Sequence, residues 1–479
     1  MTPPPSCSRA VRIGVSGLVL VSTVFGAVLV PAAANAEGTG APPATSPVVA
    51  PSGAAPTAAD RPTLPSATVT SLHSDVPVTP IGSAADVRAA DGTQFARSDL
   101  RQAGRWIHRG QSFVVDVPGS VTAAEIGVGQ YGSYLHVNDC RDVGIWTQSL
   151  HPGRNEVTAP HDGLVSVIDR STTDTGTVTV RGGHPVPTYV AGRTDRAVFD
   201  RQLREWRDAP FLQLVGDRVQ ADVLRAESTA TADQNEELLA GQDLDARIGR
   251  WDDIVRTNEA FWGAGRAAHR VHLATPSRGV AGSAEYASPH DGWIGFATDH
   301  AAPHGLLTGD SSFGGEQHVR RAIGRVFQQD VTRWRDGFDQ VDRDTSADLA
   351  SIVVEERVNA RNHLDSWTSK VQRFRATPIG QRDFWSNKLT TTTRSLMYDQ
   401  LRRAYGDDVI ARIAAASRGD APERDARRTF VRAAARVTDR DLTHFFQEWG
   451  ITVEDDLRAE LATHPEPETA IWDDFDALH

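Results

Sequence analysis

Cysteine and lysine are nearly absent from this sequence of 479 residues. Its two cysteines are Cys7 and Cys140, and only Cys140 follows the apolar run near the N-terminus. An exported chain without that run would have no internal disulfide, so its stability must come from hydrophobic cores. Arginine supplies nearly all of the positive charge, because lysine occurs only at Lys370 and Lys388. A single arginine is therefore weaker evidence of function here than in most proteins.

The sequence also has fewer basic residues than acidic ones. The 50 basic residues face 62 acidic residues, which gives a net charge of −12. Residues 1–36 contain two arginines and no acid, so a chain without them would carry −14. A surface of this sign repels phosphate groups, which argues against nucleic acid or an anionic membrane as a partner.

The sequence has one long apolar run and lacks a second. Arg9 and Arg12 precede this run at residues 13–30, and Ala34-Asn35-Ala36 then forms a small-x-small cleavage site. The pattern predicts a signal peptide over residues 1–36 and a secreted, extracellular protein that has no membrane contact after cleavage. A run of 18 residues is also long enough for an uncleaved membrane anchor, which is the alternative interpretation.

Residues 37–95 lack the apolar content that a core requires. Between residues 37 and 80 the chain has nine prolines and twelve serines or threonines. This composition cannot bury enough apolar surface to fold. It predicts a disordered, extended spacer over residues 37–95.

From residue 96 to residue 235 the sequence changes to short β-branched runs. Turn residues separate SFVVDV (112–117), LVSVID (164–169) and GTVTVRG (176–182). Several short strands without a helical period between them predict a β-sandwich domain. The stretch GVGQYG (127–132) fits a dinucleotide fingerprint, but the residues after it alternate like a strand where a helix is required. We interpret its glycines as a tight turn.

A helical period starts near residue 236 and continues to residue 462. One apolar stripe, which Gly263 is placed to end, consists of Leu244, Ile248, Trp251, Val255 and Trp262. We therefore expect an α+β multidomain protein, in which the β-sandwich precedes a mainly α-helical domain over residues 236–462. Residues 463–479 form an acidic tail, which we expect to be mobile.

The segment GEQHVRRAIGRVFQQDVTRW, residues 315–334, has the spacing of an amphipathic helix. Its buried face is predicted to contain Val319, Ile323, Val326, Phe327, Val331 and Trp334. Arg321 and Arg325 are four residues apart, so they lie together on the opposite side. A zinc-peptidase helix places the two histidines of His-Glu-x-x-His at this spacing, but no such motif occurs in the sequence.

The surrounding motifs resemble those of the enhancin-like metallopeptidases, peptidase family M-sixty. The helix RAIGRVFQQ (321–329) is similar to the family's HEIGHNYQQ, SAEYASPHDGWIGF (283–296) to its HSGYPI loop, and EERVN (355–359) to its EVTVN segment. The resemblance extends over roughly residues 96–460. It implies a zincin-like domain of the gluzincin type, and a family activity that cleaves mucin-type glycoproteins.

The chain departs from this family at the positions that bind zinc and that activate water. Arg321 and Arg325 occupy the two histidine positions, and Ala322 occupies that of the general base. Glu355 retains the position that in the family supplies the third zinc ligand. A zinc ligand must offer a lone pair, whereas arginine stays protonated in proteins, and alanine has no carboxylate to activate water. We therefore expect no catalytic residue, no metal ligand and no cofactor at this site.

We predict a degenerate binding cleft in place of the zinc site. Arg321 and Arg325 would face Glu355, with charge-assisted hydrogen bonds where the resemblance implies zinc. His290 and Trp293 would form a rim that stacks on sugar. The alternatives are two solvated arginines on a polar helix face and a packed loop around His290 and Trp293.

Two functions from different classes follow from these expectations. The first is a secreted, non-catalytic protein that binds glycoprotein or glycan. The second is an active metallopeptidase on mucin-type glycoproteins, which would require zinc and displaced metal ligands. The candidate donors outside the motif are His300, His304, His318, Glu356 and His363.

Overall fold

The computed structural model describes residues 64–134, 137–225, 235–264, 268–277, 287–298, 302–309, 315–335, 342, 344–359, 365–418 and 425–474. These residues combine strands with helices, as predicted for an α+β protein. The predicted signal peptide and the first part of the spacer, residues 37–63, lie outside the described residues. None of the described helices is long and apolar enough to cross a membrane.

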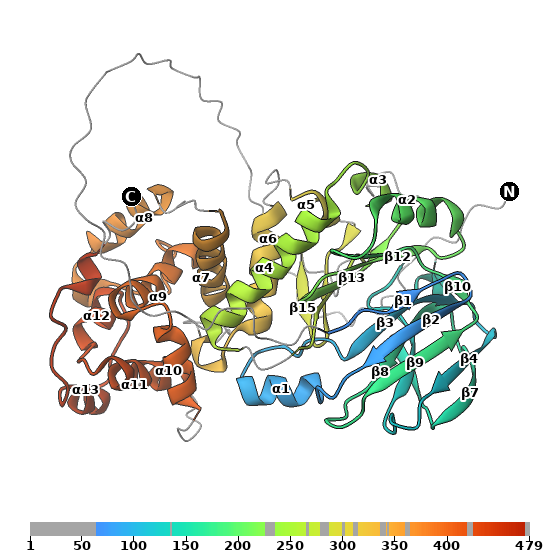
Figure 1. The fold of residues 1–479 in the computed structure, drawn as a ribbon. Helices are drawn as coiled ribbons and strands as arrows, with labels where there is room; N and C mark the ends of the chain where they lie inside the picture. Colours follow the sequence, from blue (N-terminus) through green and yellow to red (C-terminus); the bar gives the residue numbers. More distant parts are fainter. Residues whose placement is uncertain are drawn as a thin grey trace, which may run out of the picture. The chain divides into compact units, whose positions relative to one another are not determined.

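Two antiparallel sheets of five strands each are formed by the N-terminal part of the described chain (Figure 1). The first sheet has, in spatial order, β1 (Thr68–Val69), β2 (His73–Val78), β9 (Gly176–Arg181), β4 (Ser112–Val117) and β7 (Gly153–Thr158). The second has β10 (His184–Pro185), β3 (Leu100–Ile107), β8 (Gly163–Ile168), β5 (Glu125–Gly129) and β6 (Ile145–Ser149).

One hydrophobic cluster joins these two sheets. The first sheet contributes residues such as Val115 and Val180, and the second contributes Ile126 and Val167, all of which are fully buried. In β4 the buried residues alternate with more exposed ones, because successive side chains of a strand point to opposite faces of the sheet. The run SFVVDV, which was predicted to be a strand, thus places Phe113, Val115 and Val117 in the shared core.

A third sheet of six strands packs against the other face of the second sheet. Its strands, in spatial order, are β11 (Thr188–Val190), β12 (Phe211–Val215), β13 (Val219–Leu224), β14 (Val271–Ala274), β16 (Trp293–Gly295) and β15 (Ser288–His290). Trp106 of β3 and Phe211 of β12 share a small aromatic cluster at one end of this contact. Elsewhere the contact is polar, and Gln102 donates a hydrogen bond of 2.7 Å to Asp222. Every residue of β3 is buried, because sheets cover both of its faces.

Helices that lie between and after the strands of the third sheet in the chain share its hydrophobic core. Those that precede the C-terminal part are α1 (Ala84–Asp91), α2 (Arg196–Glu205), α3 (Asn235–Leu238), α4 (Leu244–Trp262), α5 (Ala302–Thr308), α6 (Gly315–Phe327) and α7 (Thr345–Val354). The others are α8 (Asp365–Arg375), α9 (Thr391–Tyr405), α10 (Val409–Ser417), α11 (Ala426–Thr438), α12 (Thr443–Glu448) and α13 (Asp455–Leu461). A π-helical segment, η7 (Glu355–Asn359), continues α7, and short 3₁₀ turns are η2 (Asn138–Cys140), η6 (Asp330–Thr332), η8 (Ile379–Gln381) and η9 (Ile471–Asp473).

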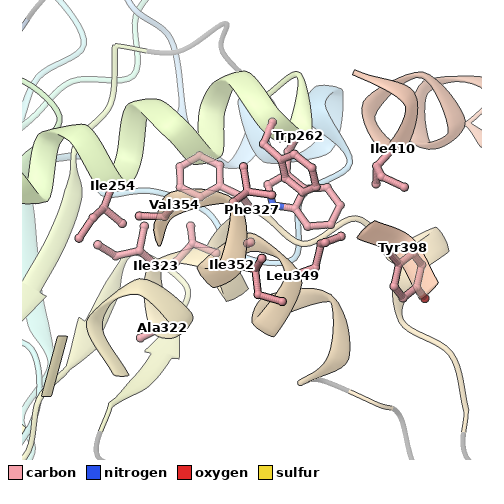
Figure 2. Packing of buried hydrophobic residues seen from close by; sticks show 14 of the residues in the cluster. Ile254, Trp262, Ala322, Ile323, Phe327, Leu349, Ile352, Val354, Tyr398 and Ile410 are labelled. Carbon is pink, nitrogen blue, oxygen red and sulfur yellow. The ribbon is translucent and has the colours of Figure 1, made fainter. Parts of the chain in front are cut away.

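Helix α4 begins and ends where the sequence predicted. The Asp243 side chain caps its N-terminus by accepting a hydrogen bond from the amide of Ala246. Gly263 ends it in the left-handed conformation, with φ of 65°. Its predicted apolar stripe is buried, and Figure 2 shows Ile254 and Trp262 of α4 among side chains from α6 and α7.

The structure differs from the predicted spacer at its C-terminal end. Within residues 37–95, residues 68–69 and 73–78 form β1 and β2, and residues 84–91 form α1. β2 pairs with β9 from His73↔Arg181 to Val78↔Gly176, so a neighbouring strand supplies the stability that this proline-rich composition lacks by itself. The composition predicted disorder because it contains no information about this pairing.

The predicted boundary between residues 235 and 236 also differs from the structure. The third sheet crosses it, since β11, β12 and β13 precede residue 235 while β14, β15 and β16 follow it. The three later strands have only three or four residues each, which is too short for a periodic signal in the sequence. In the tail, Ile471 is buried in the helical core and η9 is formed, so at least residues 471–473 are fixed by packing.

Candidate functional site

Helix α6 has the apolar face that its sequence predicts. Val319, Ile323, Val326 and Phe327 are all at least 97 % buried, and they join the core that α4 and α7 share. Gly324 lies at the crossing with α7, where a Cβ would come within 3.0 Å of the Ala350 side chain. The small residue therefore allows the two helices to approach closely, which fixes the side chains on the rest of α6 relative to α7.

The helix ends at Phe327, which is seven residues before the predicted end. The main-chain amide of Gln94 donates a hydrogen bond of 2.8 Å to the carbonyl of Gln328, and Thr93 forms an isolated bridge with Gln329. A segment from far away in the sequence thus uses acceptors that a continuing helix would need. Val331 and Trp334 are still buried, but they follow a separate turn, η6.

Arg321 and Arg325 lie on the same side of α6, as predicted, and both contact the start of α7. The Arg321 guanidinium is 3.0 Å from a carboxylate oxygen of Asp344 and 3.0 Å from one of Asp348. The Arg325 guanidinium donates a hydrogen bond to Asp344. The side chain of Arg321 is 25 % exposed, so it is neither a fully solvated arginine nor a core residue.

The predicted partner of these arginines was wrong. Glu355 is paired instead with Arg320, whose guanidinium lies 3.3 Å from it. Arg320 also contacts Glu316 at 2.9 Å, and Arg250 of α4 binds both oxygens of Glu316 at 2.8 and 3.0 Å. Helices α6 and α7 run in opposite directions, so the end of α7 meets residue 320 while its start meets residues 321 and 325.

These seven residues form what we call the carboxylate cluster: Arg320, Arg321, Arg325, Glu316, Asp344, Asp348 and Glu355. Burial lowers the pKa of Arg320, and the carboxylates of Glu355 and Glu316 oppose this shift. Burial raises the pKa of Asp348, and the charge of Arg321 with hydrogen bonds from Thr391 and Thr392 acts in the opposite direction. Within the cluster three positive charges face four negative ones, so it presents no net positive charge to a ligand.

Ala322 stands at the general-base position of the resembling motif. It is 2 % exposed and belongs to the main hydrophobic core, and Figure 2 shows it near Ile323 on α6. A glutamate at this position would place a carboxylate in an apolar environment without a partner, which is costly. The local packing is therefore adapted to a small apolar side chain.

The residues at this site do not fit a zinc ion. Two of the three ligand positions hold guanidinium groups that offer no lone pair and that repel a cation. The third, Glu355, already has Arg320 as its counter-ion. Since the general-base position is a buried alanine, we derive no metal-dependent step for this site.

The other candidate metal donors are not brought together by the described part of the chain. His300 and His363 lie outside the described residues. Glu356 is paired with Arg402 at 2.6 Å, and His304 lies in α5. Among the described residues, no group of three or more histidine, cysteine or acidic side chains is arranged to hold a metal ion.

His290 and Trp293 lie in the β15–β16 hairpin, and β15 packs beside α6. The Trp293 ring stacks on Tyr131 at 5.4 Å with an angle of 4° between the rings, and on His290 at 4.8 Å. Gly292 has a φ of 89°, and a Cβ there would lie 2.8 Å from the Tyr131 hydroxyl. The hairpin thus packs closely against the segment that follows β5, and all three rings remain only partly buried.

Several residues of this site were not predicted. Arg320 was missed because the resemblance directed attention to position 321, and Asp344 and Asp348 were missed because nothing in the sequence pairs them with α6. Tyr131 lies in GVGQYG, whose glycines were assigned to a turn; Gly129 and Gly132 do have positive φ values of 143° and 84°. The only available signal was the aromatic residue between two turn glycines.

Comparison with known proteins supports the resemblance. Residues 335–450 match the family model described as Peptidase M60, enhancin and enhancin-like. A search of curated proteins gave no match. The predicted similarity to the enhancin-like family is confirmed.

Solved structures share the fold at low sequence identity. A functionally unknown conserved protein from Bacillus anthracis is 19 % identical, with a TM-score of 0.70 over 84 % of this chain and 80 % of that chain. The catalytic module of the metalloprotease ZmpA from Clostridium perfringens is 16 % identical, with a TM-score of 0.64 over 83 % and 80 %. The M60 catalytic domain of ZmpC from the same organism, solved in complex with the sialyl T antigen, is 14 % identical, with a TM-score of 0.63 over 83 % and 81 %.

Proposed function

We propose that this protein of the enhancin-like peptidase family is a secreted, non-catalytic member that binds glycoprotein or glycan. The observation that carries the proposal is the pairing of Arg321 and Arg325 with Asp344 and Asp348. Guanidinium groups held by carboxylates occupy the positions where the family's motif has histidines. This arrangement is incompatible with zinc-dependent hydrolysis but leaves polar groups for recognition.

The support for a glycan ligand comes from the relatives. Among the structural neighbours, one domain is solved with the sialyl T antigen and another metallopeptidase is solved with the Tn antigen. The surface that we propose for a glycan in this chain combines the partly exposed Arg321 with the hairpin that bears His290 and Trp293. Hydrogen-bonding groups beside an aromatic ring edge are suited to a sugar.

The charge of the carboxylate cluster narrows the class of glycan. Its three arginines are neutralised by Glu316, Asp344, Asp348 and Glu355, so it offers no electrostatic attraction to a sialic acid. We therefore propose a neutral, unsialylated glycan on a glycoprotein as the preferred ligand.

We also infer the domain organisation from the same arrangement. The first two sheets would form a β-sandwich domain, and the third sheet with the helices would form the peptidase-like domain. The N-terminal apolar run followed by a small-x-small site supports export through a cleaved signal peptide.

The test of binding compares glycopeptides that carry the Tn antigen or the sialyl T antigen with the unglycosylated peptide, using isothermal titration calorimetry. We expect binding of the Tn glycopeptide, at least tenfold weaker binding of the sialylated one, and loss of binding in Arg321→Gln. Arg427→Gln is the matched control, because Arg427 is 26 % exposed and also has two carboxylate partners. Equal binding by both variants would contradict the proposed site.

The test of catalysis measures metal content and mucin digestion. We expect less than about 0.1 zinc per chain by mass spectrometry, since no described group fits the ion. A mucin-type glycoprotein should remain intact with and without chelator. Stoichiometric zinc together with chelator-sensitive cleavage would favour an active metallopeptidase with displaced ligands.

A further inference from the structure

Residues 64–79, which we call the strap, are fastened to the second and third sheets by three buried arginines. Arg105 donates hydrogen bonds to the Thr70 and Ser71 carbonyls and to the Ser74 hydroxyl. Arg101 donates to the carbonyls of residues 77 and 79 at 2.9 and 2.8 Å. Arg270 donates to the carbonyl of residue 64 and to the hydroxyl of residue 66.

None of these three arginines forms an ion pair with a carboxylate of the described chain. Their acceptors are main-chain carbonyls and hydroxyl groups, which carry no full negative charge. Burial lowers the pKa of Arg101, and it lowers the pKa of Arg105 and of Arg270 to about 10. Carboxylates outside ion-pair distance, Asp169 and Asp99 for Arg101 and Asp252 and Asp217 for Arg270, raise these two pKa values but do not offset the effect of burial.

Arg101 and Arg270 line the same pocket, whereas Arg105 does not. The pocket is small, with about 20 Å³ of space for the centre of a water-sized sphere, and it opens to solvent. Residues 65–67 of the strap cover one side of it, and Gln102, Thr188 and Gln220 lie on the other sides. The positive charge of Arg101 contributes to the lowered pKa of Arg270, so the two guanidinium groups are close enough to repel each other.

Each of these two guanidinium groups retains donor capacity. Arg270 uses Nε for the Gly216 carbonyl and Nη2 for the strap, and its Nη1 makes no hydrogen bond to any described residue. Arg101 uses both of its Nη atoms, and its Nε likewise makes none. The Gln102 amide on the pocket wall is not a further donor, because its Nε2 already donates to the Ala221 carbonyl and to Asp222.

We propose that this pocket binds a small anion, either a carboxylate group or an inorganic anion of similar size. Two guanidinium groups that converge on one space are suited to an anion, because charge-assisted hydrogen bonds are strong where water is largely excluded. The anion neutralises the repulsion between Arg101 and Arg270. Since the strap covers the pocket, the bound anion also fastens the strap to the sheets.

The test is anion-dependent stability of the full chain at constant ionic strength. A bulky organic sulfonate, which has no carboxylate group, serves as the background, and formate, acetate and chloride are exchanged into it. We expect a saturable rise in Tm with formate and acetate, as required when a ligand binds only the folded state. Poly-glutamate is the second probe, because equal saturation by it would identify the ligand as a carboxylate of a larger chain.

Variants separate the pocket from the strap. Arg270→Gln should reduce the apparent affinity for formate at least tenfold, while Arg105→Gln, which also removes contacts to the strap, should retain the response. If Arg270→Gln does not fold, Arg101→Lys keeps the charge but removes the planar donor pair, and it should weaken formate binding. Bromide soaked into crystals should give an anomalous peak between Arg101 and Arg270.

Two outcomes would overturn the proposal. One is a response that is absent or unsaturable in the unmodified protein, which indicates a general salt effect. The other is a response that Arg105→Gln abolishes as fully as Arg270→Gln does. Arg321→Gln should leave the response unchanged, so a failure here is distinct from a failure of the proposed glycan site.

Discussion

Two regions of the molecule each contain three arginines that are at least partly buried, and they stabilise the charge in different ways. Around α6 and α7, Arg320, Arg321 and Arg325 all contact carboxylates. Beneath the strap, the three arginines at positions 101, 105 and 270 contact carbonyl and hydroxyl groups only. The comparison shows that the arginines at the positions of the family's motif are electrically satisfied. The arginines with unused capacity for an anion lie in a part of the chain where no motif occurs.

Removal of a carboxylate from the first region should reduce the stability of the protein more than removal of an arginine from the second region. Asp348 is 3 % exposed, pairs with Arg321, and accepts hydrogen bonds from Thr391 and Thr392. Asp348→Ala removes the shared acceptor of the two threonine hydroxyls and leaves Arg321 with Asp344 alone, and we expect a loss of about 3–5 kcal/mol in the free energy of unfolding. Urea unfolding measures it. The exposed pair of Asp253 with Arg256 provides the control, since Asp253→Ala should cost less than about 0.5 kcal/mol.

A smaller effect is expected when an arginine of the second region is removed. Arg105→Met eliminates the hydrogen bonds to residues 70, 71 and 74, but it also removes a buried charge whose pKa is lowered to about 10. Because the two effects oppose each other, we expect a loss of only about 1–2 kcal/mol. A cost equal to that of Asp348→Ala would mean that carbonyl groups compensate arginine as well as carboxylates do.

Glu355→Gln should have a still smaller effect. Arg320 keeps Glu316 at 2.9 Å as a second carboxylate partner, and the Glu355 side chain is 15 % exposed. We expect a loss of about 1 kcal/mol, again from urea unfolding. A loss above about 3 kcal/mol would show that the pair behaves as a fully buried one.

The pKa values of two buried or partly buried acids, Asp348 and Asp99, are shifted in opposite directions, so the two acids change stability with pH in opposite ways. Burial raises the pKa of Asp348, so this group contributes more stability as the pH falls through the window above 3.8. Burial by itself raises the pKa of Asp99, but hydrogen bonds from His269, the Ala84 amide and Arg170 hold this pKa below 3.8. Its contribution is present above 3.8 and is lost as the pH falls below that value. The difference in unfolding free energy between the protein and Asp348→Asn, and that for Asp99→Asn, should therefore have slopes of opposite sign between pH 2 and 6.

Local sequence patterns predicted those helices and strands that are long enough to repeat a pattern of buried and exposed side chains. The stripe of α4 and the cap at Gly263 were read directly, because a helix of 19 residues repeats its signal several times. The β-branched run SFVVDV between turn residues predicted β4. The third sheet was missed, since strands such as β14 (VHLA) and β16 (WIG) are too short to show a period.

Local sequence patterns predicted the candidate site only in part. Arg321 and Arg325 were correctly placed on one side of α6, because that follows from helical geometry. Their partners depend on the direction in which α7 crosses α6, which no local pattern contains. A difference of one residue, from Arg321 to Arg320, changed the partner of Glu355.

The packing around Ala322 has a consequence for the evolution of such a protein. A single substitution back to glutamate would place a carboxylate in the core next to Ile323, while Arg321 and Arg325 still blocked metal binding. The intermediate would lose stability and would gain no activity that selection could favour. Under the proposed non-catalytic function, the residues at positions 321, 322 and 325 would therefore have to change together before a zinc site could form.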